Sequence, residues 1–143
     1  MKLNLGSGKR PKEGYINIDI HSFPEVDIVA DITKGLPMED SSVDYVYSED
    51  WLEHLPPESK IPVMNEIWRV LKPGGIFLSH TPIYPYASAF RDPTHINILT
   101  VETFPLYFDD QTRWGSIYGF TGAFKILHQT IKRPHLISVL EKV

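Results

Sequence analysis

The chain contains no cysteine among its 143 residues. This absence excludes disulfides, thiolate metal sites and cysteine nucleophiles, although it does not fix the cellular compartment. The sequence also has no apolar run of transmembrane length, and its first residues enter a predicted strand directly, without the apolar stretch of a signal peptide. We therefore expect a soluble cytoplasmic protein with no membrane partner.

Long runs of lysine or arginine are missing as well, and the net charge is -4. Proteins that bind nucleic acids usually carry a clustered basic face, so a nucleic-acid partner is disfavoured. The chain does have 42% hydrophobic and 22% charged residues, fractions that are typical of a globular protein and not of a disordered one. Its length predicts a single domain.

The most informative segment is the start of the chain, where a predicted strand ends in a glycine loop. Residues 3–5 form the strand, and Gly6-Ser7-Gly8 follows it. Because glycine has no Cβ, such a loop lets the backbone approach a ligand closely. The next predicted strand, residues 15–19, ends in Asp19, whose carboxylate can accept hydrogen bonds from both hydroxyls of a ribose. Together, the loop and the acid predict a pocket for an adenosine-bearing cofactor.

A nicotinamide-binding dehydrogenase is an alternative explanation of a glycine loop. Such folds have a third glycine that opens a helix, and their acid follows about 20 residues later. Here Asp19 follows Gly8 after a much shorter interval, and no helix fits between them. The spacing therefore disfavours the dehydrogenase.

The rest of the chain continues as strands with one clear helix. Residues 26–31, 43–48 and 76–80 are predicted strands, and residues 57–72 are a predicted helix because apolar residues recur there every three or four positions. Residues 124–131 and 136–140 predict a closing antiparallel hairpin. The links between the first three strands are too short for the usual crossover helix. Either compact loops join these strands, or they are not parallel.

This series of segments resembles the class I S-adenosylmethionine-dependent methyltransferases, specifically the small methyltransferase type 11 group. The resemblance covers most of residues 2–81 and rests on the order of six segments, which are residues 3–8, 17–19, 29–32, 36–44, 51–55 and 66–75. It implies an α/β protein with a three-layer Rossmann-like methyltransferase fold and a mixed, mostly parallel seven-stranded sheet. The chain lacks the N-terminal helix and the helices that usually surround strands 1–3, which implies reduced helical cover there.

The resemblance also suggests how the single domain, residues 1–143, is organised. Residues 1–81 would form a cofactor-binding half, residues 82–123 a substrate or cover region, and residues 124–143 the closing antiparallel pair. An apolar sheet face without helices tends to find a partner, so we expect self-association, most simply as a homodimer.

The cofactor that the resemblance implies is S-adenosylmethionine, and the activity is transfer of its methyl group to a small-molecule or sugar acceptor. A domain that binds the cofactor without catalysis, as a binding or scaffolding subunit, is the alternative. Asp31 and the amide of Ile32 are expected at the adenine edge, although Asp31 could also simply cap a turn. The implied cofactor-binding residues are Leu5, Gly6, Ser7, Gly8, Asp19, Ile20, Asp31, Ile32, Ser48 and Glu49.

Two histidines are candidates for catalysis on the acceptor side. His54 follows the fourth strand, near the expected position of the methyl group. His95 ends a charged segment, residues 91–95, in the region where the family builds its substrate pocket. His80, at the end of the fifth strand, is a weaker candidate because it could merely line the cofactor cleft.

A divalent metal is a further alternative near His54. Asp50, Glu53 and His54 would lie on one face of a helical turn, and an acid and imidazole at that spacing can hold Mg²⁺ or Mn²⁺. In most proteins with this motif, however, the Glu-His pair only begins the helix beneath the cofactor. We therefore expect no metal here.

Overall fold

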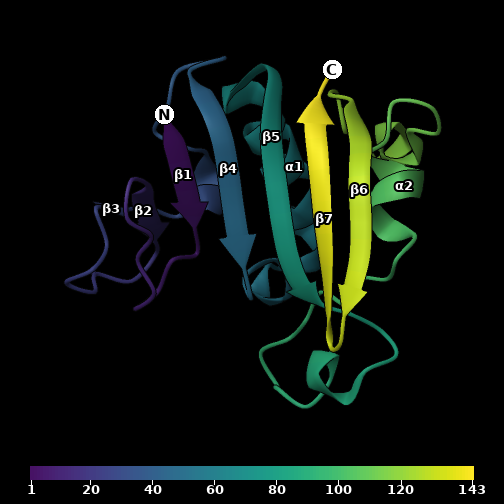
Figure 1. Cartoon of the computed structure of the whole chain (residues 1–143), viewed down its shortest axis with the longest axis horizontal. Helices are drawn as coiled ribbons and strands as arrows, with labels where there is room; N and C mark the ends of the chain where they lie inside the picture. The colour runs from purple at the N-terminus through teal and green to yellow at the C-terminus, as the bar shows by residue number, and fades with distance from the viewer.

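A computed structural model describes all residues, 1–143, and contains one seven-stranded sheet of order β3-β2-β1-β4-β5-β7-β6 (Figure 1). The neighbouring strands among β1–β5 are parallel, whereas β7 is antiparallel to both β5 and β6. The predicted α/β class, mostly parallel sheet and closing hairpin are therefore confirmed. The strands are β1 (Lys2–Leu5), β2 (Ile16–Asp19), β3 (Ile28–Val29), β4 (Val43–Glu49), β5 (Leu71–Pro82), β6 (Phe124–Lys132) and β7 (His135–Lys142).

Compact loops join the first three parallel strands, and a buried asparagine organises them. The side-chain oxygen of Asn17 accepts hydrogen bonds from the amide of Lys12 at 2.8 Å and from the side chain of Asn4 at 2.9 Å. On the other side of β2, the backbone oxygen of Asn17 accepts from the amide of Asp27 at 2.8 Å. These bonds satisfy backbone groups of the loops that a crossover helix would otherwise satisfy internally. The first of the two alternatives from the sequence is therefore confirmed.

The main helix is α1 (Lys60–Val70), which is shorter at both ends than the predicted helix. A 3₁₀ turn occupies Pro57–Ser59, and the chain becomes extended at Leu71, where β5 begins. Proline disfavours helical geometry in the residue before it, so Pro73 accounts for the early end. The buried residues of the helix, which are Val63, Met64, Ile67 and Val70, pack against the sheet.

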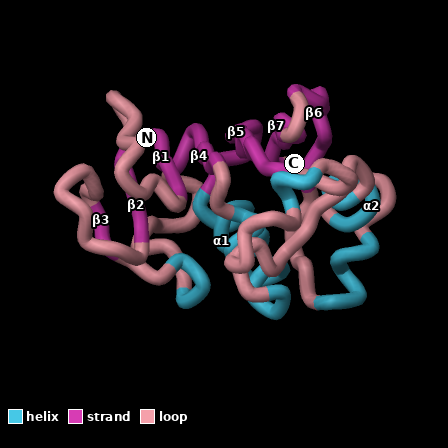
Figure 2. The backbone as a smooth tube through the Cα atoms, turned by 90° about the horizontal axis from the view of Figure 1, so that it is seen from below, coloured by secondary structure: helices cyan, strands magenta, loops and turns pink.

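Both helices, α1 and the short α2 (Thr103–Tyr107), lie on the same side of the sheet (Figure 2). The opposite face carries no helix, so the chain has two layers and not the three expected, and the reduced cover extends beyond β1–β3. On β4, β7 and the second half of β5, side chains on this bare face are partly exposed, while their neighbours along the strand are buried. At the centre of the bare face lie Tyr45, Tyr47, Ile76, Leu78, Ile137 and Val139.

The core lies between the sheet and the helices, and aromatic rings fill its end near β5, β6 and β7. Phe104, Phe108 and Phe120 come from the region 82–123 and are each at most 2% exposed. Phe104 packs edge-to-face on Phe77 of β5, and Phe120 stacks on Phe124 of β6. Three phenylalanines of the predicted substrate or cover region therefore belong to the core. None of the helices is long and apolar enough to cross a membrane.

Candidate active site

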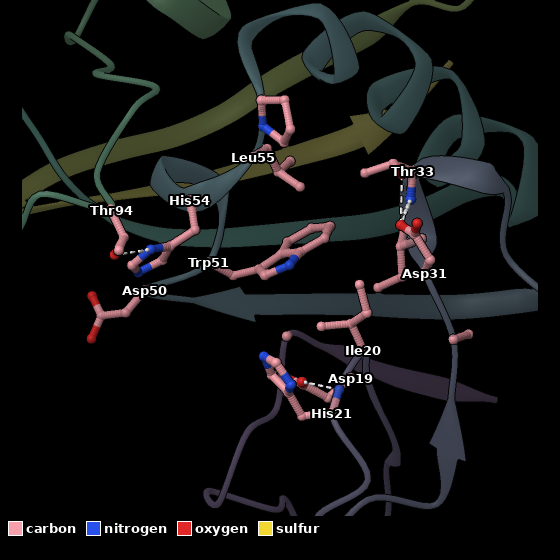
Figure 3. Close-up of a pocket in the computed structure, with 14 residues that line it drawn as sticks. Asp19, Ile20, His21, Asp31, Thr33, Asp50, Trp51, His54, Leu55 and Thr94 are labelled. Atoms are coloured by element: carbon pink, nitrogen blue, oxygen red, sulfur yellow. Dashed lines mark hydrogen bonds between the residues drawn. The ribbon is translucent and has the colours of Figure 1, made fainter.

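A cavity of about 550 Å³, called here the strand-end cavity, opens at the carboxyl ends of the parallel strands (Figure 3). Parallel strands end at the same edge of a sheet, so the residues that follow β1, β2, β3 and β4 converge there. Its lining comprises Gly6, Asp19, Ile20, His21, Ala30, Asp31, Ile32, Thr33, Asp50, Trp51, His54, Leu55, Pro56 and Thr94.

Asp19 is fixed in this cavity by two backbone amides. One carboxylate oxygen accepts from the amide of Gly8 and the other from the amide of His21, both at 2.9 Å. The residue is only 8% exposed. Each carboxylate oxygen can accept a further hydrogen bond, so the carboxylate remains able to bind ligand hydroxyls. The acid also connects the glycine loop to the end of β2, which the sequence spacing alone does not reveal.

Gly6 lies directly against Trp51, a residue that the sequence did not single out as part of the site. The backbone of Gly6 has φ +65°, and a Cβ there would stand 2.7 Å from the Cβ of Trp51 and overlap its indole ring. Figure 3 shows this indole in the middle of the lining, between Asp31 at one end and His54 at the other. A large aromatic residue shortly after the end of a predicted strand is the sequence signal that could have identified Trp51 as a site residue.

Asp31 both caps a turn and lines the cavity. Its carboxylate accepts from the amide of Thr33 at 3.1 Å and from the Thr33 hydroxyl at 2.6 Å, at the start of the 3₁₀ turn Ile32–Lys34. The hydroxyl bond lowers the pKa of Asp31, so the carboxylate stays charged at neutral pH. The predicted contact with an adenine edge stays a prediction.

Not all predicted cofactor residues line the strand-end cavity. The side chains of Leu5 and Ser48 are buried on paired neighbouring strands. Ser7 and Glu49 line a separate cavity of about 120 Å³, which also reaches Gly6, and the Tyr47 hydroxyl donates to Glu49 there at 2.7 Å. Gly8 contributes through its amide to Asp19. The remaining predicted residues do line the strand-end cavity; they are Gly6, Asp19, Ile20, Asp31 and Ile32.

The structure brings the two candidate catalytic histidines together. The rings of His54 and His95 have centroids 4.8 Å apart and cross at 78°. Their segments are joined because the amides of Ile96 and Asn97 donate to the backbone oxygen of Glu53, at 2.9 and 3.0 Å. Two loops that are distant in sequence therefore form one wall.

A third cavity, of about 340 Å³ and called here the histidine cavity, is lined by both rings. It shares His54 and Asp50 with the strand-end cavity, so His54 stands between the two. Glu53 also lines it and is fully buried, and this burial raises the pKa of its carboxyl to about 8. Other polar lining groups are the charged side chains of Arg10, Asp50, Arg91 and Asp92 and the imidazole of His135.

Asp50 does not share a helical face with Glu53 and His54. It has φ +50° and precedes the 3₁₀ turn Leu52–His54, and its carboxylate lies 2.7 Å from Nε2 of His135. His80 stacks on His135 with ring centroids 4.4 Å apart and lines neither cavity. Burial, together with the neighbouring His135, lowers the pKa of His80, so the ring is neutral at physiological pH. From the sequence, Asp50 was expected on one helical face with Glu53 and His54, and His80 in the cofactor cleft. Both positions differ in the structure.

Comparison with known proteins agrees with this geometry. Residues 9–79 match a family model described as a methyltransferase domain. The matched segment belongs to this methyltransferase-domain family. Its cofactor is S-adenosylmethionine, as the sequence resemblance implied. The strand-end cavity fits this cofactor, because the buried carboxylate of Asp19 and Gly6, which has no Cβ, both line it.

A relative from Mycolicibacterium smegmatis, named as a probable S-adenosylmethionine-dependent methyltransferase, is 42% identical over 60 residues, which are 42% of this chain and 23% of that protein. The chain spans less than a third of the length of the curated relatives it matches.

Solved structures show the same fold over nearly the whole chain. A SAM-dependent methyltransferase from Archaeoglobus fulgidus superposes with a TM-score of 0.69 at 16% identity, covering 99% of this chain and 85% of that one. The 1,6-didemethyltoxoflavin-N1-methyltransferase of Burkholderia thailandensis, solved with its substrate and S-adenosylhomocysteine, gives 0.69 at 13% identity, covering 99% and 70%. These superpositions establish the methyltransferase fold of the domain. Because the identities are low, they do not identify the methyl acceptor.

Proposed function

We propose that this chain transfers the methyl group of S-adenosylmethionine to a small-molecule or sugar acceptor held in the histidine cavity. The observation that carries the proposal is the position of His54, which lines both cavities. A donor in one cavity and an acceptor in the other would meet at this side chain. No feature of the site supports the alternative of a non-catalytic binding subunit.

S-adenosylmethionine, when bound, supplies a methyl group on a sulfonium whose leaving group is already activated. The task of the protein is therefore to align two reactants and to exclude water. Asp19 would accept hydrogen bonds from the ribose hydroxyls, held in place by the amides of Gly8 and His21. Trp51 and Leu55 supply apolar surface to the strand-end cavity.

On the acceptor side, the chain offers two imidazoles within reach of one another. His54 is 37% exposed at its side chain and His95 only 11%. We infer that one acts as a base or orienting group and that the other contacts the acceptor.

The replacements His54→Ala and His95→Ala should each slow methyl transfer about a hundredfold or more, the usual contribution of a positioned acid–base group. The affinity for S-adenosylhomocysteine should stay within a few-fold of wild type, because Asp19 and the glycine loop, and not the two imidazoles, would hold the cofactor. Release of S-adenosylhomocysteine, on an acceptor found by screening small metabolites, measures the rate. His128→Ala, on the exposed part of β6, is the matched control. Full activity in both folded variants would assign the histidines a structural role.

We also propose that the chain self-associates through the bare face of its sheet. Light scattering should then give a mass of about twice the 16.4 kDa monomer. Val139→Glu places a charge at the centre of this face and should yield monomers, whereas Ile117→Glu, at an exposed position on the helical side, should not. A monomeric wild type at all concentrations would refute the interface.

A further inference from the structure

The carboxylate of Glu53 is buried without a hydrogen-bond partner. Its side chain is 1% exposed, and neither oxygen has a partner within the chain. Its position is fixed, because its backbone oxygen accepts from two amides and the neighbouring Leu52 oxygen accepts from the side chain of Asn97. A buried carboxyl group without a hydrogen-bond partner is costly even when it is protonated, so its place in the structure calls for an explanation, such as a bound ion.

The two nearest side chains both turn a lone pair toward this carboxylate. Nδ1 of His95 lies 3.1 Å from the carbonyl oxygen of Ala89, and since a carbonyl only accepts, Nδ1 carries the proton. Nε2 of His95 is then unprotonated in the neutral ring. It lies 3.9 Å from Oε1 of Glu53.

His54 is held in the same tautomer by a longer chain of hydrogen bonds. The hydroxyl of Thr94 donates to Asp92 at 2.7 Å, so its oxygen is left to accept from Nδ1 of His54 at 3.0 Å (Figure 3). Nε2 of His54 is therefore also unprotonated, and it too lies 3.9 Å from Oε1 of Glu53. Orientation of ligand histidines through their Nδ1 atoms is characteristic of metal sites.

Two imidazole lone pairs and the Glu53 carboxyl thus converge without a hydrogen bond between them. A proton on Glu53 does not bridge to either imidazole, because 3.9 Å exceeds the length of a hydrogen bond. All the ligand atoms lie within 4.8 Å of one another. Ligands at about 2.1 Å from a tetrahedral ion stand about 3.4 Å apart, so a small inward movement would complete the site.

We propose that Glu53, His54 and His95 bind one divalent transition-metal ion, of the type of Zn²⁺, Mn²⁺ or Fe²⁺. Two imidazoles among three ligands favour these ions over Mg²⁺ and Ca²⁺, which prefer oxygen. Oδ2 of Asp92, 3.6 Å from Nε2 of His95, adds negative charge at the rim. Asp50 and Asp92 offset the charges of Arg10 and Arg91 in the same cavity.

Three protein ligands leave at least one coordination position open toward the histidine cavity, as in catalytic and not structural sites. There the ion would bind an acceptor oxygen and lower the pKa of a hydroxyl, with His54 serving as a ligand in place of a base. This role, unlike metal binding itself, rests on the proposed function.

Titration of the metal-free, untagged protein with Co²⁺, followed by visible absorption, and competition with Zn²⁺ test the site. We expect one equivalent to bind. Glu53→Gln and His95→Ala should each weaken Zn²⁺ binding at least about a hundredfold, and Thr94→Val, which removes only the orienting hydroxyl, about tenfold. His128→Ala should bind like wild type.

The same variants also serve as controls for correct folding. Glu53→Gln keeps the side-chain volume and replaces the buried carboxyl with a neutral amide, so its metal-free melting temperature should stay close to that of wild type. Zn²⁺ should raise the melting temperature of wild type and of His128→Ala, but not that of Glu53→Gln or His95→Ala. Absence of stoichiometric binding, or equal binding in wild type and the folded Glu53→Gln and His95→Ala variants, would overturn the site. Binding of S-adenosylhomocysteine is measured without metal, so the proposed function stands or falls separately.

Discussion

The replacement Asp19→Ala is expected to lower the affinity for S-adenosylhomocysteine about ten- to a hundredfold. The change removes the acceptor for both ribose hydroxyls, and hydrogen bonds to a charged group contribute about 1.5–3 kcal/mol. It also frees the amides of Gly8 and His21, which now donate to the carboxylate. Calorimetric titration of wild type and variant measures the difference.

Asp44→Ala is the matched control for charge. This carboxylate lies near the opposite end of β4, where it pairs with Lys72 at 2.7 Å, and it lines neither of the two main cavities. Its loss should leave the affinity unchanged. If wild type and Asp19→Ala bound S-adenosylhomocysteine equally, the ribose would have to lie elsewhere.

Gly6→Ala should have the other large effect, because it places a methyl group on Trp51. The new Cβ would overlap the indole, and the backbone would keep φ +65°, which L-residues rarely adopt. We expect a loss of about 1–3 kcal/mol in the free energy of unfolding. We also expect at least tenfold weaker binding of S-adenosylhomocysteine, since Trp51 would move within the cavity.

Gly14→Ala separates these two causes. Gly14 has φ +78°, but nothing lies within 4 Å of the Cβ that it would gain. This variant should therefore show the backbone strain without the loss of binding. Denaturant unfolding and calorimetry of both variants provide the comparison, and identical behaviour would mean that contact with Trp51 does not shape the site.

The sequence predicted the strands well because their positions follow from local patterns. Alternating residues mark β4, and the Pro-Gly-Gly segment marks the end of α1. The compact loops between β1 and β3 depended on Asn17, whose side chain bonds residues from two different segments. Such a contact leaves no periodic signal. The bare sheet face was expected only near β1–β3, since its extent depends on which side the later helices pack.

Site residues that directly follow a strand were the predictable ones. Asp19 ends β2, and Gly6 and Asp31 follow the ends of β1 and β3, so the fold itself brings them into one cavity. Ser48, which is within the central strand β4, has its side chain buried, because strand residues alternate between faces. The approach of His95 to Glu53 could not be predicted, because it depends on backbone hydrogen bonds from Ile96 and Asn97.

The central claim is that the strand-end cavity of this chain binds the methyl donor. Its most direct test is calorimetric titration of the wild-type protein with S-adenosylhomocysteine and, in parallel, with NAD. We expect one equivalent of S-adenosylhomocysteine to bind per chain and NAD to give no binding heat. Binding of NAD without binding of S-adenosylhomocysteine would contradict the claim.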